Sequence, residues 1–185
     1  MAYEFKVTRR VEFSETDMEG IMHFSNFFRF METAEHAFFR SLGYSVVLSR
    51  NGIMLCLPRV HAECDYTAPL RFEDEVQIHL LVEKKTRRSL TYQFRFRRLN
   101  GSAAEEVARG RLTIVCAERQ ANGALKAAAF PAEISERIQE APPALLVNGS
   151  SPRDKPPEAV PIPIKRGQVP ARASRQSQHL LPSKL

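Results

Sequence analysis

Hydrophobic and polar side chains alternate at the start of the chain. Residues 3 to 13 place Tyr3, Phe5 and Val7 between polar neighbours such as Glu4. A period of two is typical of a strand with one buried face. We therefore predict that the first element is a half-buried strand.

From Ser25 to Leu42 the spacing of apolar residues changes to three and four. Ser25 is the predicted N-cap and Gly43 the predicted C′ residue of a helix. Additional apolar positions widen the stripe beyond the single face of a surface helix, which predicts a helix surrounded on most sides. The apolar positions are Phe24, Phe27, Phe28, Phe30, Met31, Ala34, Ala37, Phe38, Phe39 and Leu42.

Turn residues then separate further segments with a period of two. Pro58 marks an edge position or a bulge in the first of them. The others alternate apolar with largely polar side chains, as strands of an antiparallel sheet with one covered face do. The four predicted strands cover residues 53 to 67, 75 to 85, 89 to 98 and 104 to 118.

A short amphipathic helix is predicted at residues 131 to 140. The predicted fold class is α+β, with a curled five-stranded antiparallel sheet wrapped around the long central helix.

Charge and composition divide the chain in two. The net charge is +6, but residues 1 to 141 hold 20 Lys and Arg against 19 Asp and Glu, so +5 lies in residues 142 to 185. That last stretch holds 9 of the 12 prolines and none of the Phe and Tyr residues. It has too little apolar surface to offset its ordering entropy. We predict one folded domain at 1–141 and a disordered, Pro-rich basic tail at 142–185.

Several classes of protein are disfavoured by the remaining features. Cys56, Cys64 and Cys116 lack the spacing of a disulfide framework or zinc site, and we expect reduced core thiols. Neither a secretory leader nor a membrane span is apparent, which predicts a cytoplasmic protein without membrane insertion. The tail has no aromatic residue to stack on bases, so no specific nucleic-acid partner is predicted. His61 and His79 fall on polar strand faces, where we expect surface histidines.

The loop before the helix carries a motif. Residues 15 to 27 read ETDMEGIMHFSNF. This segment resembles the Asp-x-x-Gly-(Ile/Val)-(Val/Met)-aromatic signature of the 4-hydroxybenzoyl-CoA thioesterase-like acyl-CoA thioesterases, a group that includes thioesterases associated with the Tol-Pal system. The resemblance covers roughly residues 5 to 140 and implies the hotdog fold. It continues through Phe30-Met31-Glu32, Pro69, Arg88-Ser89-Leu90 and Val115-Cys116.

Thioester hydrolysis needs a carboxylate beside the acyl carbon and hydrogen-bond donors aimed at the carbonyl oxygen. Asp17 precedes a helix start, where unpaired N–H groups favour an oxyanion. Asp17 is therefore the predicted nucleophile or general base. The resemblance assigns the donor amide to Phe24 and gives Gly20 the role of admitting the thioester to the loop backbone. It requires no metal or organic cofactor.

The roles of two further residues stay open at this stage. His23 either orients water or touches the acyl carbonyl, or instead hydrogen-bonds the loop. Glu32 is an auxiliary at the site or, as the favoured alternative, a structural partner in a dimer interface or on the second strand. The sequence departs from the family pattern at positions 23 and 24, where the histidine and aromatic types are exchanged, and at Glu19, so the acyl preference of other members is not transferred.

Cationic residues near a pocket mouth would suit the phosphates of CoA. By the resemblance, the hairpin and a strand edge contact the nucleotide and pantetheine parts, and Ser89 adds backbone and hydroxyl bonds. A solvated hairpin tip is the alternative. The predicted CoA-binding set is Arg59, Lys85, Arg87, Arg88 and Ser89, with Lys84 beside them.

The predicted function is an acyl-CoA thioesterase that forms a free acid and CoA. The resemblance also implies a homodimer or homotetramer whose protomers pair edge to edge and share their sites. Two alternatives remain, a hotdog hydratase or dehydratase acting on acyl thioesters, and a non-catalytic acyl-CoA-binding or interaction protein that uses the tail.

Overall fold

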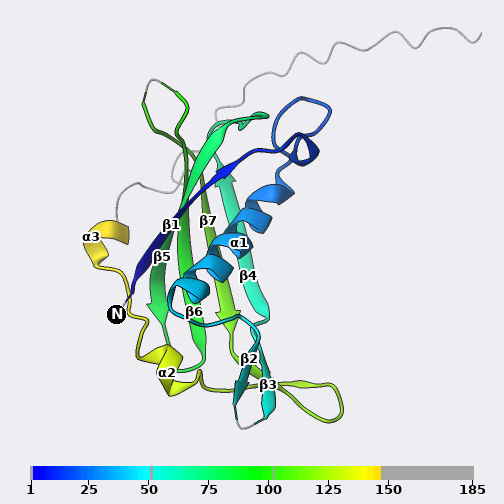
Figure 1. Cartoon of the computed structure of the whole chain (residues 1–185), viewed down its shortest axis with the longest axis vertical. Coiled ribbons are helices and arrows are strands. Elements are labelled where there is room, and N and C mark those ends of the chain that lie inside the picture. The colour runs from blue at the N-terminus through cyan, green and yellow to red at the C-terminus, as the bar shows by residue number, and fades with distance from the viewer. Residues whose placement is uncertain (1, 51, 102, 147–185) are drawn as a thin grey trace, which may run out of the picture. The chain divides into compact units, whose positions relative to one another are not determined.

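The computed structural model describes residues 2–50, 52–101 and 103–146. Its main feature is a five-stranded antiparallel sheet in the order β1-β5-β6-β7-β4. Its strands are β1 (Glu4–Arg10), β4 (Arg59–Tyr66), β5 (Glu75–Lys85), β6 (Ser89–Arg98) and β7 (Glu105–Val115). Figure 1 shows α1 (Ser25–Ser41) lying across one face of this sheet. The predicted fold class is confirmed, and this main sheet has the predicted five strands.

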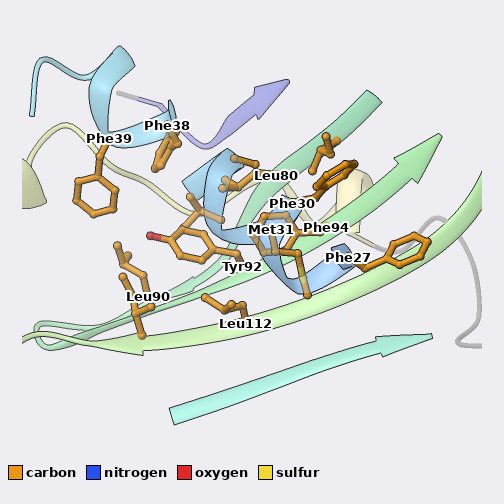
Figure 2. Close-up of a cluster of buried hydrophobic side chains, with 14 of the residues drawn as sticks. Phe27, Phe30, Met31, Phe38, Phe39, Leu80, Leu90, Tyr92, Phe94 and Leu112 are labelled. Atoms are coloured by element: carbon orange, nitrogen blue, oxygen red, sulfur yellow. The ribbon is translucent and has the colours of Figure 1, made fainter. Parts of the chain in front are cut away.

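The core lies between α1 and the sheet. Phe30, Met31 and Phe38 from the helix are each at most 1% exposed, and Tyr92 and Phe94 from β6 are fully buried opposite them. Figure 2 shows these side chains facing one another across the helix–sheet interface. The alternation and the helical stripe in the sequence therefore define the same core.

The helix approaches β7 closely at Gly110. A Cβ atom on this residue would lie 2.4 Å from Met31 Sδ. Since real Cβ atoms do not come so near a sulfur atom, only glycine lets Met31 pack here.

The two ends of α1 bear differently on the predictions. Gly43 has φ +86°, its N–H donates to the carbonyl of Arg40, and Tyr44 N–H donates to the carbonyl of Phe39. This is the predicted left-handed C′ termination. Ser25, however, is the first helical residue, and Phe24 occupies the N-cap position without a side-chain cap. The N-cap prediction for Ser25 was wrong, because the helix begins one residue earlier in the loop.

A second, smaller sheet was not predicted. It has four short strands, β2 (Leu48–Arg50), β3 (Ile53–Cys56), β8 (Ala117–Arg119) and β9 (Leu125–Ala127), in the order β2-β3-β8-β9. The predicted strands 53–67 and 104–118 therefore each divide between two sheets. Pro58, which lacks a backbone N–H, lies between β3 and β4 at the first of these divisions.

The segment after β9 contains two short helices. Of the predicted helix 131–140, only α2 (Ala132–Ser135) is helical, and it is followed by α3 (Pro143–Leu146). Ala141 N–H donates to the Val82 carbonyl at 2.8 Å, which attaches this segment to β5. Residues 142–146 belong to the predicted tail, and the rest of that tail lies outside the described residues.

His79 corrects one further expectation. It is only 6% exposed, and its Nε2 lies 2.7 Å from Glu4 Oε2 on β1. Burial lowers the pKa of this imidazole, against the opposing effect of Glu4.

Within the described ranges, no helix is both long and apolar enough to cross a membrane.

Candidate active site at the start of the central helix

Asp17 opens a tight turn. Gly20 N–H donates to the Asp17 carbonyl at 3.0 Å, and Asp17 N–H donates to the Ile21 carbonyl at 2.9 Å. Gly20 has φ +71°, and a Cβ there would meet nothing within 4 Å. This is a three-residue loop closed by a left-handed glycine. The fold itself thus requires Gly20 for its backbone conformation.

The loop is fastened to the helix start. Asn26 Nδ2 donates to the Glu15 carbonyl at 2.7 Å, and His23 N–H donates to the same carbonyl at 2.9 Å. Asn26 is 7% exposed. It was not predicted as a site residue, although a polar side chain four residues before Phe30 on an apolar stripe is a signal for such a role. It fixes where Asp17 lies relative to α1.

A cavity of about 450 Å³ lies beside this turn. The Asp17 carboxylate is half-buried at its wall, and its Oδ1 accepts a hydrogen bond from Glu19 N–H at 2.9 Å. Most of the lining is apolar, as the acyl part of a thioester would require. The lining residues are Asp17, Ile21, Met22, Phe24, Phe27, Tyr66, Thr67, Ala68, Pro69 and Leu70.

Tyr66, at the end of β4, connects the cavity wall to the helix start. Its hydroxyl donates to the Phe24 carbonyl at 3.3 Å, and its ring packs edge-on against Phe27 at 5.0 Å. Burial raises the pKa of this hydroxyl to about 12, so it remains a donor at neutral pH. Burial likewise raises the pKa of the nearby Cys64 thiol to about 12, which leaves it protonated and a poor nucleophile.

His23 takes a different direction from Asp17. Its Nδ1 lies 2.8 Å from Ser25 Oγ, and its ring packs beside Phe24 with centroids 4.5 Å apart. His23 does not line the 450 Å³ cavity. Its contacts are those of the loop-bonding alternative.

The structure does not bring the predicted CoA-binding residues together with Asp17 in one protomer. Ser89 pairs with Val115, and Arg59 with Ile114, whereas Tyr66 pairs with Ala108 at the other end of the sheet. The eight residues of β4 separate the two ends by roughly 23 Å. Figure 1 shows the loop before α1 and the α2 region at opposite ends of the strands.

The predicted CoA-binding residues at this end of the sheet differ in whether their side chains already have partners within the protein. Lys85 Nζ donates to the carbonyls of Ser135 and Ile138, so its ammonium is held by the C-terminal segment. Ser89 Oγ lies 2.7 Å from Thr86 Oγ1, a contact that closes the hairpin. Arg87 and Arg88 are exposed.

Comparison with known proteins places this arrangement in a family. The sequence profile of the Thioesterase-like superfamily matches residues 11–138. The chain belongs to this superfamily. The extent of the match is close to that of the predicted resemblance, and the predicted family is confirmed.

This thioesterase-like protein is similar in sequence to two curated proteins and in structure to a solved thioesterase. A curated Aquifex aeolicus protein with the provisional name of esterase is 38% identical over 91 residues, or 49% of this chain and 70% of that protein. A 1,4-dihydroxy-2-naphthoyl-CoA hydrolase of Prochlorococcus marinus is 31% identical over 99 residues, or 50% of this chain and 66% of the hydrolase. The 4-hydroxybenzoyl-CoA thioesterase of Pseudomonas sp. strain CBS-3 has a TM-score of 0.63 at 22% identity, over 73% of this chain and 99% of that one. The last likeness shows the shared hotdog fold.

A second carboxylate cluster of the thioesterase-like domain lies further along α1. Arg59 Nη2 on β4 donates to Glu35 Oε2 at 2.8 Å and lies 3.0 Å from Glu32 Oε1. A bulge between Arg59 and His61 turns Arg59 toward the helix, whereas simple alternation placed it on the polar face. Glu32 therefore has its strand partner and does not line the Asp17 cavity.

Glu35 was missed by the sequence interpretation. It lies four residues after Met31 and three before Phe38, on the apolar stripe, and is 1% exposed. Burial raises the pKa of its carboxyl to about 7, against the lowering effect of Arg59. Among the described residues, no group of three or more His, Cys, Asp or Glu side chains is arranged to hold a metal ion.

Proposed function

We propose that this protein is an acyl-CoA thioesterase that converts an acyl-CoA and water into a free acid and CoA. The observation that carries the proposal is the position of the Asp17 carboxylate at an apolar cavity that also includes the start of α1. Membership of the Thioesterase-like superfamily and the hydrolase name of the Prochlorococcus relative support it. A cytoplasmic location and an association with the Tol-Pal system stay predictions.

In the proposed reaction, Asp17 acts on the thioester carbonyl carbon. As a nucleophile it would form a mixed anhydride that water then cleaves, and as a general base it would take a proton from the attacking water. In both routes the C–S bond breaks and the departing thiolate takes up a proton. Where water attacks the acyl carbon, of the thioester or of the anhydride, the oxygen of water ends in the acid. The carbonyl oxygen becomes negative on the way.

The start of α1 supplies the stabilisation of that oxygen. In the described part of the chain the Phe24 amide donates to no backbone carbonyl, and it lies at the positive end of a 17-residue helix. The Tyr66 bond to the Phe24 carbonyl fixes the orientation of this residue. The phenyl ring of Phe24 offers no donor, so the proposed oxyanion contact is a backbone one.

CoA binding is proposed to involve a second copy of the chain. Among the described strands, β4 stands at the edge of the five-stranded sheet, and its Val60 is 61% exposed. Antiparallel pairing of two β4 strands would set the Arg59 end of one protomer beside the Tyr66 end of the other. A homodimer of this kind, alone or within a homotetramer, would bring Arg59, Arg87, Arg88 and Ser89 of one copy toward the cavity of the other.

The alternatives have less support from the geometry. A hydratase needs a histidine and a carboxylate facing one cavity, whereas His23 bonds to Ser25 and lies outside the lining. A non-catalytic acyl-CoA-binding protein would have no need of a carboxylate at the helix start, and it predicts binding without release of thiol.

The test is the substitution Asp17→Asn, assayed by thiol release from short, long and aromatic acyl-CoAs. Turnover should fall by orders of magnitude while the circular dichroism spectrum and Tm stay unchanged. Glu19→Gln is the matched control, because Glu19 is an exposed carboxylate on the same turn that does not line the cavity. Near-normal turnover by Asp17→Asn would refute the catalytic assignment.

A further inference from the structure

The central helix touches the edge strand β4 through polar contacts at two places. Near the helix start, the Tyr66 hydroxyl binds the Phe24 carbonyl. Near the helix middle, Arg59 binds Glu35 and Glu32. On the face that packs against the sheet between these points, α1 presents Phe27, Phe30, Met31 and Ala34, all at most 3% exposed.

Hydrophobic burial is non-directional, so among the apolar contacts of α1 with the sheet it is chiefly the close approach of Met31 to Gly110 that limits movement along the helix axis. A buried ion pair adds little net stability, and its best-attested use is to fix register. Glu35 is eleven residues after Phe24, about 16 Å along the helix. Its contact with Arg59 therefore sets the axial position of the same helix whose N-cap residue, Phe24, lines the Asp17 cavity.

We propose that the Glu35–Arg59 pair is a pH-responsive positioning pair that fixes the register of α1 against β4, and with it the Phe24 amide at the active site. The inference rests on the proposed thioesterase function for its kinetic consequence. Neither residue lines the 450 Å³ cavity of its own protomer, so the pair acts on that cavity through the position of α1.

The surroundings of Glu35 make this contact sensitive to protons. A separate cavity of about 130 Å³, lined by Glu35, His36, Val46, Leu57 and Arg59, lies beside the pair. Glu35 Oε1 has no hydrogen-bond partner among the described residues, so one carboxyl oxygen is free to take the proton. With a proton on Glu35, the charge attraction to Arg59 is lost. Because burial raises the pKa of Glu35 and Arg59 lowers it, protonation favours arrangements of α1 in which Glu35 stays buried but apart from Arg59.

Other charged or titratable groups face Glu35 from three elements. On α1 these are Glu32 and His36, with Arg40 acting on His36, on β4 Arg59, and on β6 the fully buried Tyr92. Burial lowers the pKa of His36 from its ordinary value and raises that of Tyr92 well above its ordinary value. Glu35, with a pKa of about 7, changes charge near neutral pH.

The kinetic test compares the pH profiles of wild type and Glu35→Gln from pH 6 to 8. A group with a pKa of about 7 changes its ionised fraction about tenfold over this range. If only the helix register fixed by the ion pair is productive, the kcat of the wild type gains up to about tenfold relative to Glu35→Gln, with KM little changed. His36→Gln is the matched control, because it removes the neighbouring titratable group in the same cavity and should keep the wild-type profile.

The structural test does not need turnover. Hydrogen exchange of a peptide covering residues 22–31, corrected for intrinsic rates, should be faster at pH 6 than at pH 8 in the wild type and equally fast at both in Glu35→Gln. A peptide from β6 serves as the internal reference. If Glu35→Gln does not fold, the wild-type comparison alone decides the question.

The outcomes separate the two proposals. Equal pH profiles for wild type and Glu35→Gln, or helix-start exchange independent of pH in the wild type, overturn the positioning role. Exchange that depends on pH without thiol release at any pH supports the positioning role and refutes the thioesterase function.

Discussion

Two cavities lie where α1 meets β4, and each has one carboxylate in its lining, in a different environment. Asp17 projects from a tight turn into a largely apolar cavity of about 450 Å³ and is half-buried. Glu35 projects from the middle of the helix beside a cavity of about 130 Å³ and is 1% exposed. Access to substrate suits the first group to chemistry, and deep burial makes the second respond to pH. The two proposed roles therefore differ because Asp17 is accessible from a cavity and Glu35 is buried.

The largest expected effect compares amide substitutions at the two positions. Asp17→Asn should lower kcat for thioester hydrolysis by about 10²- to 10⁴-fold, the range for loss of a positioned base. Glu35→Gln should lower it by less than about tenfold at pH 8, since it leaves the Asp17 cavity intact. Thiol-release kinetics measure both. A loss in Glu35→Gln as deep as that in Asp17→Asn would mean that the buried carboxylate also reaches substrate.

The second prediction concerns stability as a function of pH. The folded-state pKa of Glu35 is raised from 4.5 to about 7, so its protonated form is favoured by folding. This contribution is fully present below pH 4.5 and is lost as pH rises through about 7, a change of about 3 kcal/mol. The free energy of unfolding of wild type relative to Glu35→Gln should fall by that amount, as measured by urea denaturation at several pH values. A constant difference across the range would show that the pKa of Glu35 is the same in the folded and unfolded protein.

The third prediction tests the packing of α1 between its two polar contacts with β4, at Tyr66 and at Arg59. Gly110→Ala would place a Cβ 2.4 Å from Met31 Sδ, so the helix or the methionine has to shift. Overpacking of this kind costs about 1–3 kcal/mol. The double variant Gly110→Ala with Met31→Ala should recover part of the loss in urea denaturation. If the single variant is as stable as wild type, the close approach of α1 to β7 is not required.

Much of the fold followed from periodicity, because alternation and the helical stripe record burial directly. The five strands, the central helix and its Gly43 end were all predicted from such patterns. Boundaries were less accessible, since Pro58 and the bulge near Arg59 act through pairing with β7, which is distant in sequence. The burial of His79 likewise depends on the neighbouring strand β1, which supplies Glu4.

The candidate site could be predicted in part. Asp17, Gly20 and Phe24 were predicted as site residues because they form one contiguous motif. The structure places them on one loop and helix start, and their chemical roles stay predictions. Tyr66 and Glu35 were missed, since each takes its role from a partner far along the chain, Phe24 and Arg59 respectively. The predicted CoA-binding residues lie at the opposite end of the sheet, a separation that only the strand register reveals.

The smallest predicted effect sharpens the role of the turn that carries Asp17. Gly20 and Gly123 occupy equivalent turns: each has φ above +70° and donates to the carbonyl three residues back. A Cβ at either position meets nothing within 4 Å, so alanine should cost only the left-handed backbone penalty, about 1 kcal/mol, in both. Gly123 closes the turn between β8 and β9, outside the Asp17 cavity. Gly20→Ala and Gly123→Ala should therefore lose similar stability by urea denaturation, while only Gly20→Ala lowers kcat for thiol release, because it disturbs the placement of the Asp17 carboxylate. Equal turnover in the two variants would argue that the geometry of this turn does not control the reaction.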